Sequence, residues 1–209
     1  MKEYFCRKTD CKLNIDGDIN KPEWESAEEI KLVETVSGYA SRLDTTVKLM
    51  WNDDYLYAAF HCQDDYICAT MTEYNDRLYE EDVVELFIDD NKDLKTYIEI
   101  EVNPLNALLH YCIHNDCKDK ILTFARLEKK VISAVKFEDG KRAFNVEIAI
   151  PFTEFVTAGN TPPQLNDIWF FNAYRIDRTE GGQVEYSAWS PTGVGNFHKP
   201  EKFGKLVFS

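Results

Sequence analysis

The stretch Val-Val-Glu-Leu-Phe-Ile-Asp at residues 83–89 alternates apolar side chains with a period of two. In a β-strand the aliphatic residues at positions 84, 86 and 88 share one face, whereas Glu85 lies on the other face. Residues 97–103, Tyr-Ile-Glu-Ile-Glu-Val-Asn, repeat this pattern, with Glu99 and Glu101 opposite the aliphatic residues. The two stretches predict neighbouring strands that bury one face and present carboxylates and aromatic rings on the other.

Strand patterns with turn residues between them recur along the rest of the chain. Asn52-Asp53-Asp54 predicts a hairpin turn, and Asp139-Gly140 predicts a second one. The expected strands are Ile30–Val36, Thr45–Trp51, Tyr55–His61, Val83–Asp89, Tyr97–Asn103, Ala107–Ile113, Lys130–Phe137, Ala143–Ile150, Ile168–Asp177, Gln183–Trp189 and Lys205–Phe208.

Helical signals are scarce, with one turn expected after Pro22 and another after Pro151. Many strands without crossover helices predict an all-β fold, a single antiparallel β-sandwich of immunoglobulin-like or jelly-roll type with one or two short helical turns. No repeat or flexible linker divides the sequence, so residues 1–209 are expected to form one domain.

The charge excludes one class of partner. The 209 residues carry 24 Lys and Arg against 37 Asp and Glu, a net charge of −13, which argues against nucleic-acid binding. No apolar run is long enough to span a membrane, so membrane insertion is not expected. The start of the chain lacks the apolar stretch of a signal peptide. We expect a cytoplasmic location if Met1 is the native start, and an extracellular or cell-surface one if a leader was removed.

The six cysteines leave two interpretations open, three disulfides in a secreted protein or free thiols in a reducing compartment. Cys62 and Cys112 lie within predicted strands, where a buried free thiol is the commoner explanation. We therefore expect mostly reduced cysteines.

The polar face of the predicted sheet also has two interpretations. A solvated sheet often mixes carboxylates with aromatics, and this face would then have no ligand. Alternatively, aromatic rings can stack on the C–H faces of pyranoses while carboxylates accept hydrogen bonds from sugar hydroxyls.

Five segments, in order, resemble the family 9 carbohydrate-binding modules over nearly the whole chain. They are residues 15–24, 51–57, 81–89, 171–175 and a closing pattern made of 189–191 and 198–204, which ends in Pro200-Glu201-Lys202-Phe203-Gly204. The resemblance implies a DOMON-like β-sandwich that is not an enzyme, that often binds calcium, and that holds the ends of sugar chains between two aromatic rings. The expected function is reversible binding of a saccharide or polysaccharide.

The resemblance also implies site residues. Tyr79 and Phe197 stand where the family has its two stacking tryptophans. Glu85 is the glutamate of the Asp-x-x-Glu motif and a hydroxyl acceptor, and Glu101 replaces a basic residue, which removes a donor and adds an acceptor. Asn172 and Arg175 are the expected donors. Three positions apart on one strand, these two point to opposite faces unless a bulge intervenes, so we favour Arg175 and expect it to pair with a carboxylate such as Glu85 or Asp177.

Two other functions remain open. Glycosidases use a pair of carboxylates, and Glu85 with Glu99 or Glu101 could form one. A degenerate sandwich with only a structural or interaction role is the other alternative.

Metal and cofactor signals are weak by comparison. Acidic turns at Asp16 and Asp18, and at Asp64 and Asp65, offer the oxygen ligands that calcium prefers, so calcium is the expected structural ion. His110 and His114 lie about 13 Å apart on a strand and cannot share one zinc ion. Met50 is better explained as core packing than as a haem ligand, and no nucleotide-binding loop is present.

Overall fold

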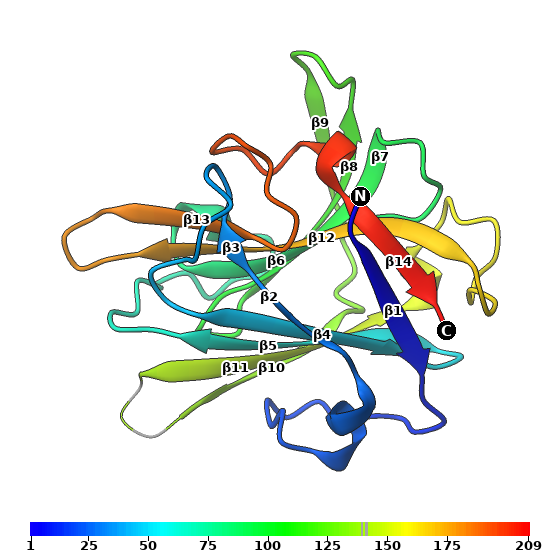
Figure 1. Cartoon of the computed structure of the whole chain (residues 1–209), viewed down its shortest axis with the longest axis horizontal. Helices are drawn as coiled ribbons and strands as arrows, with labels where there is room; N and C mark the ends of the chain where they lie inside the picture. The colour runs from blue at the N-terminus through cyan, green and yellow to red at the C-terminus, as the bar shows by residue number, and fades with distance from the viewer. Residues whose placement is uncertain (139, 141) are drawn as a thin grey trace.

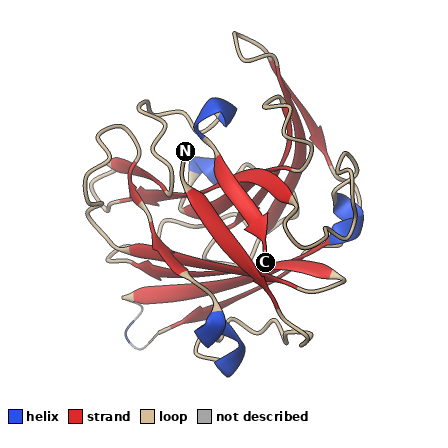
Figure 2. Cartoon of the chain, turned by 45° about the vertical axis from the view of Figure 1, so that its right-hand side comes forward, coloured by secondary structure: helices blue, strands red, loops and turns tan. Residues whose placement is uncertain are grey.

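The computed structural model describes residues 1–138, 140 and 142–209, and nearly all of its regular elements are β-strands (Figure 1). The strands are β1 Glu3–Lys8, β2 Glu29–Lys31, β3 Val33–Glu34, β4 Thr45–Trp51, β5 Tyr55–Gln63, β6 Val83–Asp89, β7 Thr96–Val102, β8 Leu108–Asn115, β9 Ile121–Ala125, β10 Ile132–Phe137, β11 Ala143–Pro151, β12 Ile168–Arg178, β13 Val184–Ala188 and β14 Gly204–Phe208. The described helices are short 3-10 turns, η1 Pro22–Ser26, η2 Leu78–Glu80, η4 Phe152–Glu154 and η5 Pro200–Lys202, which Figure 2 shows in blue.

The strands form two facing layers. One layer runs β10-β11-β5-β4, with β2 beside β4, and the other runs β14-β12-β6-β7-β8-β9, with β13 beside β12 and β3 beside β13. Strand β1 joins them, because its first four residues pair with β14 and its last two residues pair with β4. The sandwich prediction is confirmed, but both pairings of β1 are parallel, so the sheet is mixed rather than purely antiparallel.

The main core fills the space between the two layers. It contains the aliphatic residues at positions 84, 86 and 88 of β6 and at 98, 100 and 102 of β7, packed against β4, β5 and β11. The alternation in these stretches therefore predicted the buried face correctly. Cys6 and Cys62 are buried here, and all six cysteines are unpaired. Met50 is buried in a smaller cluster on the far side of β4, beneath Trp24.

The outward face of β6 and β7 differs from the expectation of a wet surface. A second apolar cluster covers it, built from Phe87, Tyr97, Tyr174 and residues of the 197–203 segment. This segment and η2 fold over the sheet, so the carboxylates of this face are buried instead of solvated.

Strand boundaries follow local chemistry. The side-chain oxygen of Asn52 accepts hydrogen bonds from the backbone N–H groups of Asp54 and Tyr55, at 2.9 and 2.8 Å, which closes the predicted hairpin between β4 and β5. Strands β1 and β9 were not predicted. The turn at Asp139-Gly140 lies partly outside the described residues. Among the described residues, no helix is long and apolar enough to cross a membrane.

Candidate functional site

An open cleft of about 700 Å³ lies on the outward face of β6, β7 and β8. Glu85 and Glu99 form part of its floor. The aromatic rings that line it come from several parts of the chain, and these are Tyr79, Phe87, Tyr111, Tyr186 and Phe197. Arg77 and His198 complete the rim. The cleft therefore combines carboxylates with aromatic walls, as the sequence predicted for this face.

Strand register brings three glutamates together beneath this cleft. Glu85 of β6 lies directly opposite Glu101 of β7, and Glu99 is on the same face of β7 two residues away. One carboxylate oxygen from each of the three lies within 4.8 Å of the others. We call Glu85, Glu99 and Glu101 the glutamate triad. One cation could contact all three side chains.

The glutamate triad is almost completely removed from water, with 2%, 4% and 0% of the residues exposed. Oε1 of Glu85 and both carboxylate oxygens of Glu101 have no hydrogen-bond partner among the described residues. Burial raises the pKa of Glu85 and Glu101 well above the ordinary value, and the neighbouring carboxylates raise it further. Burial likewise raises the pKa of Glu99 to about 7. Without a ligand, the triad is best accommodated with protons bound.

The two predicted stacking residues differ in their surroundings. Tyr79, on η2, is 39% exposed and forms an open wall of the cleft. Phe197 is only 7% exposed, because its ring stacks on Tyr174 at a centroid distance of 4.1 Å and meets Tyr186 edge-on. Phe197 is therefore part of the packed cluster, although its ring also lines the cleft.

Two hydrogen bonds fix the loop that carries Phe197. The Tyr174 hydroxyl donates to the backbone carbonyl of Phe197 at 3.0 Å. The hydroxyl of Tyr97 lies 2.8 Å from Nδ1 of His198. Burial lowers the pKa of His198 to about 4, so this imidazole is neutral at pH 7. The upper wall of the cleft is thus held in place by tyrosines that rise from the sheet.

The loop that carries Tyr79 is fixed by Asp82, the aspartate of the Asp-x-x-Glu motif. Its carboxylate accepts the backbone N–H groups of Cys68 and Arg178 at 2.6 and 2.8 Å. Burial raises the pKa of Asp82 to about 7 despite these bonds. Asp82, which follows η2 closely in the chain, therefore ties the Cys68 loop to the end of β12.

Asn172 and Arg175 point to opposite faces of β12, as their spacing predicted. Asn172 is on the cleft side but exchanges hydrogen bonds with the backbone of Ser190, so its amide is already paired. Arg175 is on the inner side, at the edge of the core between the layers, where its guanidinium lies over the ring of Phe144. Neither residue lines the cleft, and the preference for Arg175 as a ligand donor has no support in its position.

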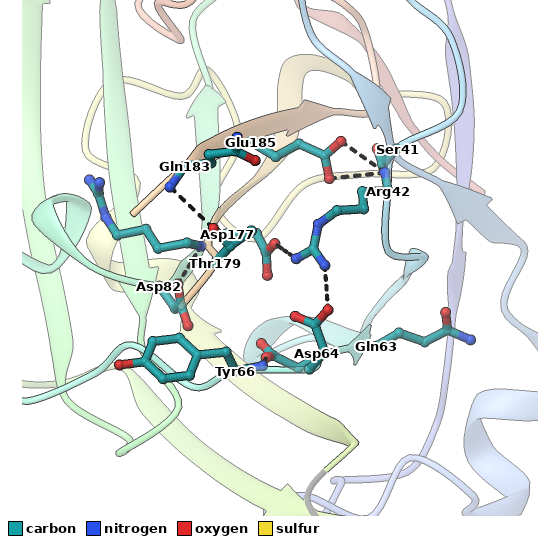
Figure 3. A network of polar contacts seen from close by, with 12 residues as sticks. Ser41, Arg42, Gln63, Asp64, Tyr66, Asp82, Asp177, Thr179, Gln183 and Glu185 are labelled. Carbon is teal, nitrogen blue, oxygen red and sulfur yellow. Dashed lines mark hydrogen bonds and ion pairs between the residues drawn. The ribbon is translucent and has the colours of Figure 1, made fainter. Parts of the chain in front are cut away.

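Arg175 instead belongs to a buried ionic network. Its Nη2 donates to Asp64 at 2.8 Å and to Asp177 at 2.7 Å, so the predicted pairing with Asp177 is confirmed and that with Glu85 is not. Arg42 reaches the other carboxylate oxygen of Asp177 (Figure 3). Arg42 also pairs with Asp65. The predicted calcium ligands Asp64 and Asp65 are thus both neutralised by arginines.

The other predicted calcium turn has a similar arrangement. Asp16 pairs with Lys21 at 2.8 Å, and Asp18 pairs with Lys136 at 2.9 Å. Calcium requires six to eight oxygen ligands. Carboxylates that are each held by an ammonium group do not fit that requirement as they are arranged. Calcium binding by these residues stays a prediction that the observed contacts do not support.

Sequence reasoning missed three wall residues. Tyr111 lies directly opposite Glu99 in the pairing of β7 with β8, so cross-strand register could have placed it in the site. Tyr186 and Arg77 had no such signal, because they reach the cleft through β13 and through the loop before η2.

A family model described as carbohydrate family 9 binding domain-like matches residues 15–209. The chain belongs to this family. The family 9 domain is 28% identical over 194 residues to endo-1,4-beta-xylanase A of Thermotoga maritima. The aligned region is 92% of this chain but 16% of that relative. The corresponding enzyme of Thermotoga neapolitana is 26% identical over the same length. The chain thus spans about a sixth of the curated relatives it matches first.

Solved structures share the fold of this family 9 domain. A protein from Bacteroides uniformis superimposes with a TM-score of 0.79 at 18% identity, covering 100% of this chain and 99% of that one. A family 9 module from Caldicellulosiruptor kristjanssonii in complex with cellotriose superimposes with a TM-score of 0.72 at 19% identity, covering 100% and 94%. The likeness shows a common sandwich architecture.

Proposed function

We propose that this family 9 domain binds saccharides reversibly and without turnover in the cleft over the glutamate triad. The observation that carries the proposal is the meeting of aromatic walls and a carboxylate floor in one open cleft. Rings offer apolar surface to the C–H faces of a pyranose, and carboxyl groups exchange hydrogen bonds with its hydroxyls.

The relatives support this proposal. Solved family 9 modules from Caldicellulosiruptor kristjanssonii carry cellotriose in one case and glucose in another. The matched xylanases are far longer than this chain, so their catalytic activity is no guide to it. A short β-linked glucose oligomer is therefore the first ligand to try.

A glycosidase would need a different arrangement of the triad. In a retaining enzyme, carboxyl groups about 5 Å apart act as an acid and an ionised nucleophile. The spacing in the triad is similar, but no lysine, arginine or histidine of the described chain forms an ion pair with these three glutamates. Burial and repulsion between the neighbouring carboxylates therefore raise the pKa of Glu85 and Glu101, which disfavours an ionised nucleophile. This electrostatic argument favours binding over catalysis.

Calorimetric titration with cellotriose, xylotriose and mannotriose tests the proposal, and product analysis after long incubation separates binding from turnover. We expect measurable binding of at least one oligomer and no new reducing ends. Release of reducing ends that disappears in Glu85→Gln would contradict the proposal and establish the glycosidase alternative.

A further inference from the structure

Part of the glutamate triad lacks the hydrogen-bond partners that buried carboxyl groups need. Glu85, Glu99 and Glu101 are each at least 96% buried, and three of their oxygens have no hydrogen-bond partner among the described residues. Buried unpaired carboxyl groups are costly, and each one in a native protein calls for an explanation such as a bound proton, water, ion or ligand. The unpartnered Oε1 of Glu85 belongs to a side chain that lines the cleft. The cleft therefore reaches the residue that carries one of the unsatisfied oxygens, and the other two belong to Glu101, which pairs with Glu85 across the strands.

The protein itself supplies no positive charge at this point. Arg77 lines the cleft and is therefore the first candidate for a cationic partner of the triad. Its guanidinium, however, pairs with Glu80 at 3.5 Å, and the arginine side chain is 71% exposed. Arg178 donates a hydrogen bond to the backbone carbonyl of Tyr79 at 3.4 Å. Neither arginine forms an ion pair with the triad among the described residues. A ligand that enters the cleft would have to bring its own cation.

The walls of the cleft indicate what kind of cationic ligand would fit beside the triad. Tyr79 rises from η2 and Tyr111 rises from β8 opposite Glu99, so flat apolar surface flanks the carboxylates. A bare divalent ion makes no use of rings, and calcium would need six to eight oxygens where the triad offers three side chains. A sugar ring that carries an ammonium group satisfies both the rings and the carboxylates.

We infer that the cleft recognises a hexosamine, an amino sugar with a free ammonium group, and that this group binds to Glu85, Glu99 and Glu101 while the sugar ring packs on Tyr79 and Tyr111. The inference rests on the proposed function, since it specifies which saccharide class the same cleft selects. Oxygens of the triad lie within 4.8 Å of one another, and an ammonium group at their centre could reach all three at hydrogen-bond distance. Its three N–H donors match the three acceptors.

Binding of a cation should expel protons from the triad. The free carboxyls hold protons because their pKa values are raised, whereas an adjacent ammonium group favours the ionised form. Affinity should therefore rise with pH across the titration of the triad and fall again once the ligand ammonium loses its proton. The other titratable groups around the triad and the cleft are Arg77 and Tyr79 near η2, Tyr97 on β7, Tyr111 on β8, Tyr174 on β12, Tyr186 on β13 and His198 in the covering loop.

Calorimetry with three matched tetramers tests the inference. These are the tetramer of β-1,4-linked glucosamine, its fully N-acetylated counterpart, and cellotetraose, which has hydroxyl groups in place of the amines. Because hydrogen bonds to charged groups are worth more than neutral ones, we expect the glucosamine tetramer to bind at least about tenfold more tightly than the other two. Proton release should be measurable from titrations in buffers of different ionisation enthalpy.

Two isosteric variants identify the groups responsible. Glu85→Gln and Glu101→Gln keep the shape of the floor but remove a negative charge, and each should abolish most of the preference for the glucosamine tetramer. Glu201→Gln is the control, because it removes the same charge from an exposed position outside the cleft. It should leave the preference unchanged. Melting curves of all variants establish that the comparison is made on folded protein.

The outcomes separate this inference from the function on which it rests. If cellotetraose binds as tightly as the glucosamine tetramer, the hexosamine inference fails and saccharide binding stands. If none of the three tetramers binds, the hexosamine inference fails, and these oligomers are not ligands of the cleft. Retention of the preference in both glutamine variants would also overturn the inference. So would a rise in melting temperature with manganese or calcium alone that is lost in Glu101→Gln, because the triad would then be a metal site.

Discussion

Phe197 stacks on Tyr174 with their ring centroids 4.1 Å apart and an interplanar angle of 16°. The same tyrosine donates its hydroxyl to the backbone carbonyl of Phe197. One residue of the sheet thus fixes both the ring and the main chain of a residue in the covering loop. The two walls of the cleft consequently differ, since Tyr79 is open to solvent and Phe197 is part of a packed cluster.

Phe197→Ala should therefore destabilise the protein as well as weaken binding. Removal of a buried phenylalanine ring commonly costs about 3–5 kcal/mol of unfolding free energy. Urea denaturation measures this loss, and Phe197→Leu should lose less because it keeps most of the volume. A denaturation midpoint of Phe197→Ala equal to that of the parent would contradict the packed role of this ring.

Tyr79→Ala should separate binding from stability. The ring is 39% exposed, so its loss should shift the melting temperature by about 2 °C or less, while truncation of a stacking residue should lower saccharide affinity about thirtyfold. Tyr79→Trp should hold or improve affinity. Tyr39, which is 78% exposed and outside the cleft, provides the control in Tyr39→Ala. If Tyr79→Ala binds the saccharide as tightly as the parent, Tyr79 does not belong to the binding site.

The glutamate triad should make the protein less stable as pH rises. Its carboxyl pKa values are higher in the folded protein than in the unfolded chain, so the native state retains protons that the unfolded state has lost. Stability from this source is present below the ordinary glutamate pKa and is lost as pH rises through about 7, the pKa of Glu99.

Glu101→Gln isolates that contribution from the rest of the chain. We expect its melting temperature to exceed that of the parent by an amount that grows between about pH 5 and pH 8. Glu201→Gln should follow the parent curve. A constant difference between Glu101→Gln and the parent over this range would show that the triad does not titrate there.

Arg175→Ala should be among the most destabilising substitutions in the chain. It leaves Asp64 and Asp177 buried without their shared cation, and breaking a buried ion pair in this way commonly costs about 3–5 kcal/mol. Arg42→Ala should cost less, because the side chain of Arg42 is 36% exposed. Saccharide affinity of both variants, measured well below their melting temperatures, should match the parent. A loss of affinity in Arg175→Ala but not in Arg42→Ala would show that Arg175 contributes to saccharide binding.

Calcium should have little effect on stability. Each carboxylate of the two acidic turns already has a cationic partner, as Asp16 has in Lys21. Treatment with EDTA followed by millimolar calcium should therefore change the melting temperature by no more than about 1 °C, since a ligand that binds only the native state would raise it. A clear rise that is lost in Asp16→Asn or Asp64→Asn would support the calcium prediction from the sequence.

Periodicity was sufficient to predict the layers of the fold. The alternation in residues 83–89 gave the strand β6 with its bounds and the face that packs between the two layers, because the aliphatic residues all fall on that face. Strand β9 could not be found in this way. All five of its residues are exposed, so packing imposes no pattern on its sequence.

The candidate site was predicted in part. Residues that share a strand face, such as Glu99 and Glu101, could be grouped because alternation is a local property. The burial of these residues could not be inferred, since it depends on η2 and on the loop around Phe197, which return to the sheet from far along the chain. Arg175 was misplaced for a related reason. Its spacing from Asn172 showed that the two residues diverge, but not which one lies inside the sandwich.

The parallel pairing of β1 with β14 has a consequence for biosynthesis. Residues Glu3–Cys6 obtain their partners from Lys205–Phe208, so the first strand made must wait for the last before the two layers can be joined at this edge. Contacts of such long sequence separation slow folding and leave strand edges unpaired in the meantime. The nascent chain should therefore close late, after β14 has left the ribosome, and truncation within β14 should expose edges in both layers at once.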